Sequence, residues 1–110
     1  TDTLAGSPEA WDEAIKRANA YVDAGATSIF MLGLATEQQV AAAVAAVRAP
    51  IAVFARPGYL PLARLAELGV GRISFGPQIL GATLHHLAQV TSQLTAQGDY
   101  PAELGYRYEL

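Results

Sequence analysis

Residues 67–77 read ELGVGRISFGP, and this stretch carries the signal that decides the fold. Gly69 ends the helical pattern before it, and Gly76 with Pro77 opens the next one. The run 72–75 between them is too short for a helix and fits a short buried strand. A helix, a strand and a second helix therefore follow one another here.

The same alternation extends over most of the chain. Strands are predicted at residues 27–32, 51–55 and 72–75, and helices at 8–24, 37–49, 62–68 and 78–97. Thr36 and Gln39 form a capping-box pattern at the start of the second helix. The strands begin about 24 and about 21 residues apart, which requires crossover connections and parallel pairing. The predicted class is α/β, either an open doubly wound sheet or a (β/α)8 barrel.

Composition narrows the function classes. The chain has 110 residues, of which 52% are hydrophobic and 15% charged, enough apolar material for the core of one domain. A net charge of −3 without a basic stripe disfavours nucleic acid and anionic membrane surfaces as partners. No apolar run approaches the roughly 18–20 residues that span a bilayer. The absence of cysteine and of a signal-peptide pattern leads us to expect a cytoplasmic location.

Several segments share their order and spacing with a known family. They are TDT (1–3), DEAIKRANAY (12–21), AGA (24–26), IF (29–30), GL (33–34), PIAV (50–53), RPG (56–58), LAELGV (65–70) and RISFG (72–76). Together they are similar to the C-terminal part of the isocitrate lyase/phosphoenolpyruvate mutase superfamily. The resemblance is strongest to the branch of carboxyvinyl-carboxyphosphonate phosphorylmutases and methylisocitrate-lyase-like proteins. It covers about residues 1–98.

The resemblance implies that residues 1–98 form the last three βα units of a (β/α)8 barrel, followed by a tail at 99–110. It also implies an enzyme that forms or breaks C–C or P–C bonds in small 2-oxo or 2-hydroxy carboxylates or phosphonates. Such enzymes use Mg²⁺, whose ligands and lid come from the other half of the family barrel. We therefore expect no catalytic residue or metal ligand in this chain, which by itself would be inactive. Family members also associate as homo-oligomers through the last helix.

Four residues are candidates for binding a small anionic substrate: Asp2, Gly33, Arg56 and Ser74. Each ends or follows an expected strand, where the active sites of (β/α)8 barrels lie. Arg56 could grip a carboxylate or phosphonate through two N–H groups, and the Ser74 hydroxyl could contact a carboxylate. The alternatives are a surface ion pair for Arg56, a backbone hydrogen bond for Ser74 and a solvated terminal carboxylate for Asp2.

Other polar residues fit structural roles better. Arg72 enters its strand and is expected at the opposite edge of the sheet. His85 and His86 point about 100° apart on a helix, so they cannot share a metal ion as residues four apart do.

A second function class stays open, namely a non-catalytic α/β module that dimerises. It would complete a barrel with a second copy or exchange its final helix, whose apolar stripe contains Leu80, Leu84, Leu87 and Leu94.

Overall fold

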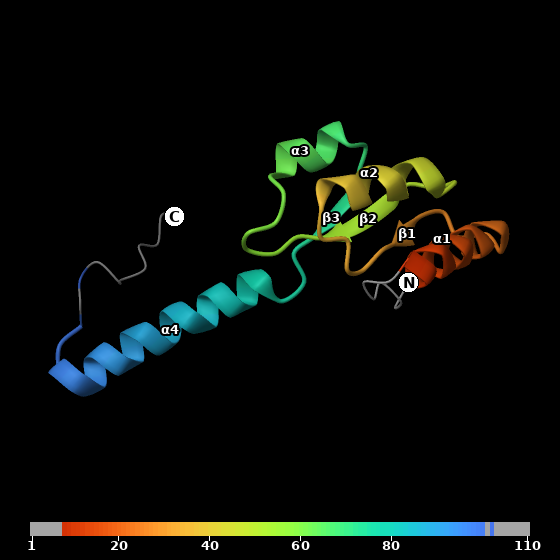
Figure 1. The fold of residues 1–110 in the computed structure, drawn as a ribbon. Coiled ribbons are helices and arrows are strands. Elements are labelled where there is room, and N and C mark those ends of the chain that lie inside the picture. The colour runs from red at the N-terminus through yellow and green to blue at the C-terminus, as the bar shows by residue number, and fades with distance from the viewer. Residues whose placement is uncertain (1–7, 101, 103–110) are drawn as a thin grey trace, which may run out of the picture. The chain divides into compact units, whose positions relative to one another are not determined.

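The computed structural model describes residues 8–100 and residue 102 (Figure 1). The chain divides into two compact units, residues 1–76 and residues 77–110, which are described separately below. The expected boundary between barrel and tail at residue 98 stays a prediction. Of the tail at 99–110, only residues 99, 100 and 102 lie within the described part.

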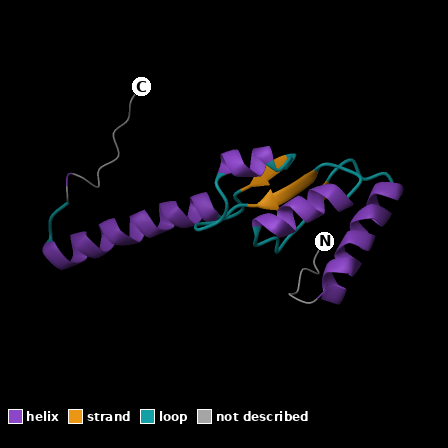
Figure 2. Ribbon diagram, turned by 45° about the horizontal axis from the view of Figure 1, so that its top comes forward, coloured by secondary structure: helices purple, strands orange, loops and turns teal. Residues whose placement is uncertain are grey.

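The first unit alternates helices and strands. In chain order its elements are α1 (Pro8–Asp23), β1 (Ile29–Phe30), α2 (Glu37–Ala46), β2 (Ile51–Phe54), α3 (Leu62–Glu67) and β3 (Arg72–Ser74). The strands form one sheet in the order β1-β2-β3, and both pairings are parallel (Figure 2). The expected α/β class with parallel strands is therefore confirmed.

β1 is shorter than the expected strand at 27–32. Among the described residues it has a neighbouring strand on one side only, so pairing with β2 alone defines it. The backbone nevertheless follows β2 a little farther, since the Met31 N–H donates to the carbonyl of Ala52 at 2.9 Å.

All three helices of this unit pack against the same face of the sheet. Ile29, Ile51 and Val53 point to that face and join one core with side chains from α1, α2 and α3. The buried members of this core are Ala14, Ala18, Ile29, Met31, Leu34, Val40, Ala43, Val47, Ile51, Val53 and Leu65. A doubly wound sheet would place helices on both faces, whereas a barrel keeps them outside. The sequential strand order with one covered face is thus the winding of a (β/α)8 barrel.

The opposite face of the sheet carries a row of three residues in register. Phe30 pairs with Ala52, and Ala52 pairs with Arg72. The guanidinium carbon of Arg72 lies 5.4 Å from the centre of the Phe30 ring, so the side chain passes over the small Ala52. Arg72 is at the amino end of β3, as expected from the sequence.

The main role of the stretch at 67–77 is to let the chain pack closely where it enters and leaves β3. A Cβ atom on Gly71 would lie 2.8 Å from Cβ of Pro50, so only glycine fits where the chain enters β3. The Gly71 N–H donates to the carbonyl of Ile51 at 2.9 Å, which holds this entry against β2. Gly76 has φ +50°, and a Cβ there would lie 2.5 Å from the ring of Phe54.

The capping box at the start of α2 is present as predicted. The Thr36 hydroxyl accepts the Gln39 N–H at 3.2 Å, and the Gln39 side chain accepts the Thr36 N–H at 3.1 Å. At the other end of α2, the side chain of Asn19 accepts the Arg48 N–H at 3.0 Å. Arg48 also pairs with Asp23 at 2.7 Å. The amino edge of β2 is thereby tied to the end of α1.

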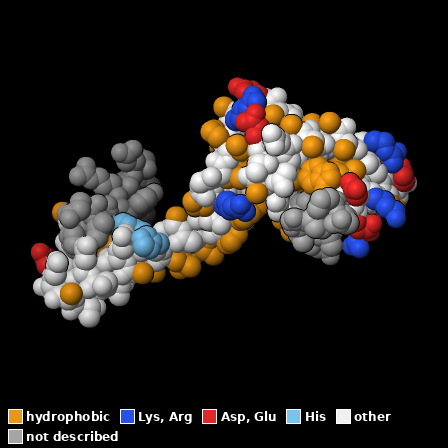
Figure 3. All heavy atoms as spheres, in the orientation of Figure 1, with side chains coloured by type: hydrophobic (Ala, Val, Ile, Leu, Met, Phe, Trp, Pro, Cys, Tyr) orange, Lys and Arg blue, Asp and Glu red, His pale blue; other side chains and the backbone are white. Residues whose placement is uncertain are grey.

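The second unit is built around α4 (Gln78–Gln97), with the bounds expected from the sequence. Gly98 ends the helix in the left-handed conformation, with φ +68°, and its N–H donates to the Leu94 carbonyl. Hydrophobic side chains form a band along the helix (Figure 3). Its exposed members include Ile79, Leu80, Leu84, Leu87 and Leu94. No helix within the described residues is both long and apolar enough to cross a bilayer.

Candidate functional site

The carboxyl ends of the three parallel strands define the candidate site. Gly33 follows β1, Arg56 follows β2, and Ser74 is the last residue of β3. The Ala55 N–H donates to the Ser74 carbonyl at 2.8 Å, so the ends of β2 and β3 lie side by side. Three of the four predicted site residues therefore belong to one edge of the sheet. The fourth, Asp2, lies outside the described residues.

Arg56 begins a tight turn that the sequence dictates. Its carbonyl accepts the Tyr59 N–H at 3.0 Å, which closes a four-residue turn with Pro57 and Gly58 in the centre. Gly58 has φ +76°. Proline at the second position and a positive φ at the third are the requirements of a type II turn. The first and fourth residues are therefore held next to each other.

The turn places the Arg56 guanidinium beside an aromatic ring. Its carbon lies 5.8 Å from the centre of the Tyr59 ring, within the range of a cation–π contact. Arg56 is exposed, whereas Tyr59 is half-buried and packs against the core. The arginine therefore has a well-anchored neighbour and an open side toward solvent.

The structure separates the arginines into two groups. Within the described part of the chain, Arg17, Arg48 and Arg64 pair with carboxylates, while Arg56 and Arg72 contact aromatic rings and no carboxylate. Only Arg56 of the latter two stands at the carboxyl edge. The surface ion pair considered for Arg56 is not observed among these residues, so its N–H donors can bind an anion.

Sequence reasoning did not single out Tyr59. Burial raises the pKa of its hydroxyl, and the positive charge of Arg56 acts in the opposite direction. The hydroxyl oxygen is enclosed and has no hydrogen-bond partner among the described residues. The Pro-Gly pair was the available signal, because a type II turn brings the residues on its two sides together.

Ser74 and Gly33 contribute mainly backbone geometry. The Ser74 hydroxyl oxygen accepts the Gly76 N–H at 3.3 Å, which is the local backbone contact weighed as its alternative role. That contact leaves its O–H available as a donor. Gly33 has φ +85°, a conformation that favours glycine where the chain leaves β1.

The described residues offer no site for Mg²⁺. No three His, Cys, Asp or Glu side chains among them come together. His85 and His86 are exposed neighbours on α4. These residues therefore do not fit the metal that the resemblance implies for the family, and no chemical step of this chain is derived from it.

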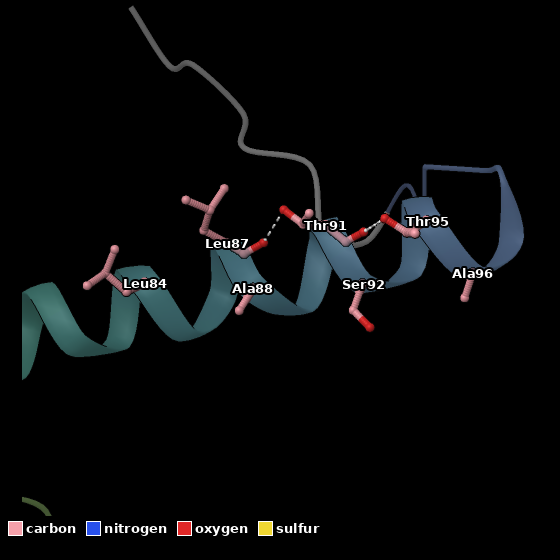
Figure 4. A pocket seen from close by; sticks show the side chains of 7 residues that line it. All are labelled: Leu84, Leu87, Ala88, Thr91, Ser92, Thr95 and Ala96. Atoms are coloured by element: carbon pink, nitrogen blue, oxygen red, sulfur yellow. Dashed lines mark hydrogen bonds between the residues drawn. The ribbon is translucent and has the colours of Figure 1, made fainter.

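A shallow groove on α4 has no charged or metal-ligating side chain among the described residues that line it. Its lining residues are Leu84, Leu87, Ala88, Thr91, Ser92, Thr95 and Ala96, all on the one helix (Figure 4). The Thr91 hydroxyl donates to the Leu87 carbonyl at 2.9 Å, and the Thr95 hydroxyl to the Thr91 carbonyl at 2.8 Å. Because these donors are used within the helix, the groove presents a mostly apolar surface.

Comparisons with known proteins agree with the geometry. Residues 1–95 match the family model described as phosphoenolpyruvate phosphomutase. No curated protein matches the chain.

Solved structures also resemble the chain. A protein of Burkholderia cenocepacia J2315, provisionally described as a lyase/mutase, is 33% identical with a TM-score of 0.78, over 90% of this chain and 36% of that one. A second protein of this organism, provisionally described as a phosphonomutase, is 34% identical with a TM-score of 0.74, over 84% and 37%. Oxaloacetate acetylhydrolase in complex with the product oxalate is 25% identical with a TM-score of 0.74, over 83% and 33%. The chain thus spans about a third of the length of these structures.

Proposed function

Because the chain belongs to the phosphoenolpyruvate phosphomutase family, we propose that it supplies one wall of the active site of such an enzyme. The enzyme would form or break C–C or P–C bonds in small 2-oxo or 2-hydroxy carboxylates or phosphonates. The proposal assigns binding of the anionic substrate, and no acid, base or metal ligand, to this chain.

The observation that carries the proposal is the position of Arg56. It is a charged donor at the carboxyl edge of parallel strands, where barrel enzymes gather their substrate contacts. It contacts a ring and no carboxylate among the described residues, so its charge is available to a ligand. A guanidinium binds a carboxylate or a phosphonate through two parallel hydrogen bonds. Oxalate, the product bound to oxaloacetate acetylhydrolase, has this chemistry.

The other predicted site residues have supporting roles in this proposal. Ser74 would donate its free O–H to the bound anion while its oxygen keeps the Gly76 N–H. Gly33 would let the chain after β1 pass close to the ligand, since it has no side chain. Asp2 stays a prediction. The described residues contain no group of three or more His, Cys, Asp or Glu side chains that could hold a metal ion, so the proposal assigns no Mg²⁺ ligand among them.

We also propose that the protein forms homo-oligomers through α4. Ile79 is 67% exposed and Leu80 is 60% exposed, values that are high for large apolar side chains in water. The same band favours the second candidate function, a non-catalytic module that dimerises. The family match, together with an Arg56 that meets no carboxylate among the described residues, makes the enzyme the better supported of the two. The cytoplasmic location stays a prediction.

Turnover of defined substrates tests the proposal. The 110-residue chain and the longest polypeptide that its gene encodes are each incubated with oxaloacetate and with phosphoenolpyruvate, with and without Mg²⁺. Substrate loss is followed by proton and phosphorus NMR. We expect turnover by the longer polypeptide and none by the chain alone. Turnover by the isolated chain, or none by either with both substrates, would contradict the assignment.

Substitution of Arg56 tests its role in the active protein. Arg56→Ala removes a charged hydrogen-bond partner of the substrate, a contact of about 1.5–3 kcal/mol, so we expect KM to rise by about 10- to 150-fold. Arg48→Ala is the matched control, because Arg48 pairs with Asp23 and precedes β2, at the opposite edge of the sheet. Equal KM values for the Arg56 variant and the control would remove Arg56 from the site.

A further inference from the structure

We propose that Tyr59 is a positioning residue that presents the Arg56 guanidinium to a carboxylate or phosphonate ligand. The inference rests on the proposed function, because it assumes that Arg56 binds the substrate. It adds a residue outside the set that the sequence pattern identified, and it makes the Arg-Pro-Gly-Tyr turn the unit that recognises the anion.

The backbone of the turn limits where Arg56 can go. Pro57 restricts its own φ, Gly58 takes φ +76°, and the hydrogen bond from the Tyr59 N–H to the Arg56 carbonyl closes the turn. Gly58 has open space around it, because a Cβ added there would meet nothing within 4 Å beyond its chain neighbours. Its φ, and not a steric contact, therefore explains why glycine suits this position.

The ring supplies a support for the guanidinium. An arginine side chain carries about 2 kcal/mol of rotamer entropy, part of which a ligand must overcome on binding. The contact with Tyr59, at 5.8 Å from guanidinium carbon to ring centre, reduces the number of conformations that Arg56 visits. Tyr59 itself is held, since it packs against the core formed by the helices and the sheet.

The contact leaves the hydrogen-bonding groups of Arg56 without an acceptor in the part of the chain that the structure describes. A cation–π contact engages the charge through the ring face and needs no acceptor atom. Arg64 shows the contrast, because its N–H groups already donate to Glu37 and Glu67. Arg56 is therefore oriented by the ring and pairs with no carboxylate among residues 8–100, a combination that suits a substrate-binding arginine.

The aromatic ring of Tyr59 orients the Arg56 guanidinium, and the Tyr59 hydroxyl takes no part in this. The hydroxyl oxygen is enclosed without a hydrogen-bond partner among the described residues, so it makes no hydrogen bond with Arg56. Phenylalanine keeps the ring face and removes only this group. Leucine keeps an apolar side chain for the core but has no ring. The pair Tyr59→Phe and Tyr59→Leu thus separates the proposed role from ordinary packing.

The experiment uses two readouts on the longest polypeptide that the gene encodes. The first is the NMR signal of the Arg56 side-chain Nε–H group, identified by its loss in Arg56→Lys. A neighbouring ring shifts this signal, so we expect it to be displaced in the wild type and in Tyr59→Phe and to move to the random-coil position in Tyr59→Leu. The second is the affinity for oxalate by calorimetry. We expect Tyr59→Phe to bind within about twofold of the wild type and Tyr59→Leu to bind about two- to fivefold more weakly.

The outcomes distinguish the inference from the function on which it rests. An Arg56→Ala variant that binds oxalate like the wild type overturns the proposed function. If that variant loses binding while Tyr59→Leu binds normally, only the role of Tyr59 is wrong. A wild-type Arg56 signal at the random-coil position also overturns the inference, and this measurement needs no variant of Tyr59 to fold.

Discussion

Replacement of Gly76 by alanine tests how the end of β3 is built. Gly76 follows Ser74 by two residues and leads out of the sheet toward α4. Two separate features of the structure oppose a side chain there. Its φ is +50°, in the left-handed region, and a Cβ would lie 2.5 Å from the Phe54 ring, a distance that requires something to move.

The expected cost is the sum of those two effects. A residue other than glycine in the left-handed conformation costs about 1–2 kcal/mol. Forcing an added methyl group against a packed side chain typically costs about 1–3 kcal/mol. Gly76→Ala should therefore lower the free energy of unfolding by about 2–5 kcal/mol. Urea denaturation of the protein, followed by circular dichroism, measures this difference.

Two further variants separate the contributions. Gly58→Ala meets a similar backbone conformation, with φ +76°, but its Cβ would meet nothing within 4 Å beyond its chain neighbours, so it should cost only about 1–2 kcal/mol. In a Phe54→Ala background the ring is gone, and the additional cost of Gly76→Ala should fall to the same value. A Gly76→Ala cost equal to that of Gly58→Ala would refute the packing of Phe54 against this glycine.

Two other expectations concern α2. Thr36→Ala removes the hydroxyl that accepts the Gln39 N–H, and it should lower the free energy of unfolding by about 0.5–2 kcal/mol in the same urea assay. The control is Thr83→Ala on α4, which removes only a hydroxyl that donates to the Ile79 carbonyl and should cost less. The hydrogen bond and charge of Arg64 lower the pKa of Glu37 below its ordinary value of 4.5, so the unfolded chain takes up this proton at a higher pH than the folded one. The stabilisation from this pair is therefore present above about pH 4.5 and is lost as the pH falls through the folded-state pKa. Between about pH 7 and about pH 3, the urea midpoint of Glu37→Gln should therefore fall less than that of the wild type. Identical pH dependence in the two proteins would show that Glu37 contributes nothing.

Much of the candidate site could be predicted because it depends on local sequence. Gly33, Arg56 and Ser74 were found as residues at or beyond the ends of expected strands, and they do occupy one edge of the sheet. Tyr59 was missed because its importance comes from a contact across a turn, not from the chemistry of its side chain. The hydrogen bond of the Ser74 hydroxyl with the Gly76 N–H, at 3.3 Å, depends on the path of the chain after β3, and the role of Ser74 in binding a ligand stays a prediction.

The sequence by itself determined the elements and their order. The bounds of α4, the capping box of Thr36 and Gln39 and the parallel pairing follow from hydrophobic period, end signals and crossover length, which are local properties of the chain.

Only the tertiary structure decided which face of the sheet the helices cover. The pattern of buried strands is the same in an open doubly wound sheet and in a barrel, because both bury their strands on two faces. Packing of α1, α2 and α3 into one core with Ile29, Ile51 and Val53 resolves this, because a doubly wound sheet carries helices on both faces and a barrel carries them on one. The same holds for the ring contact of Arg72, because Phe30 and Arg72 belong to different strands that only the sheet brings into register.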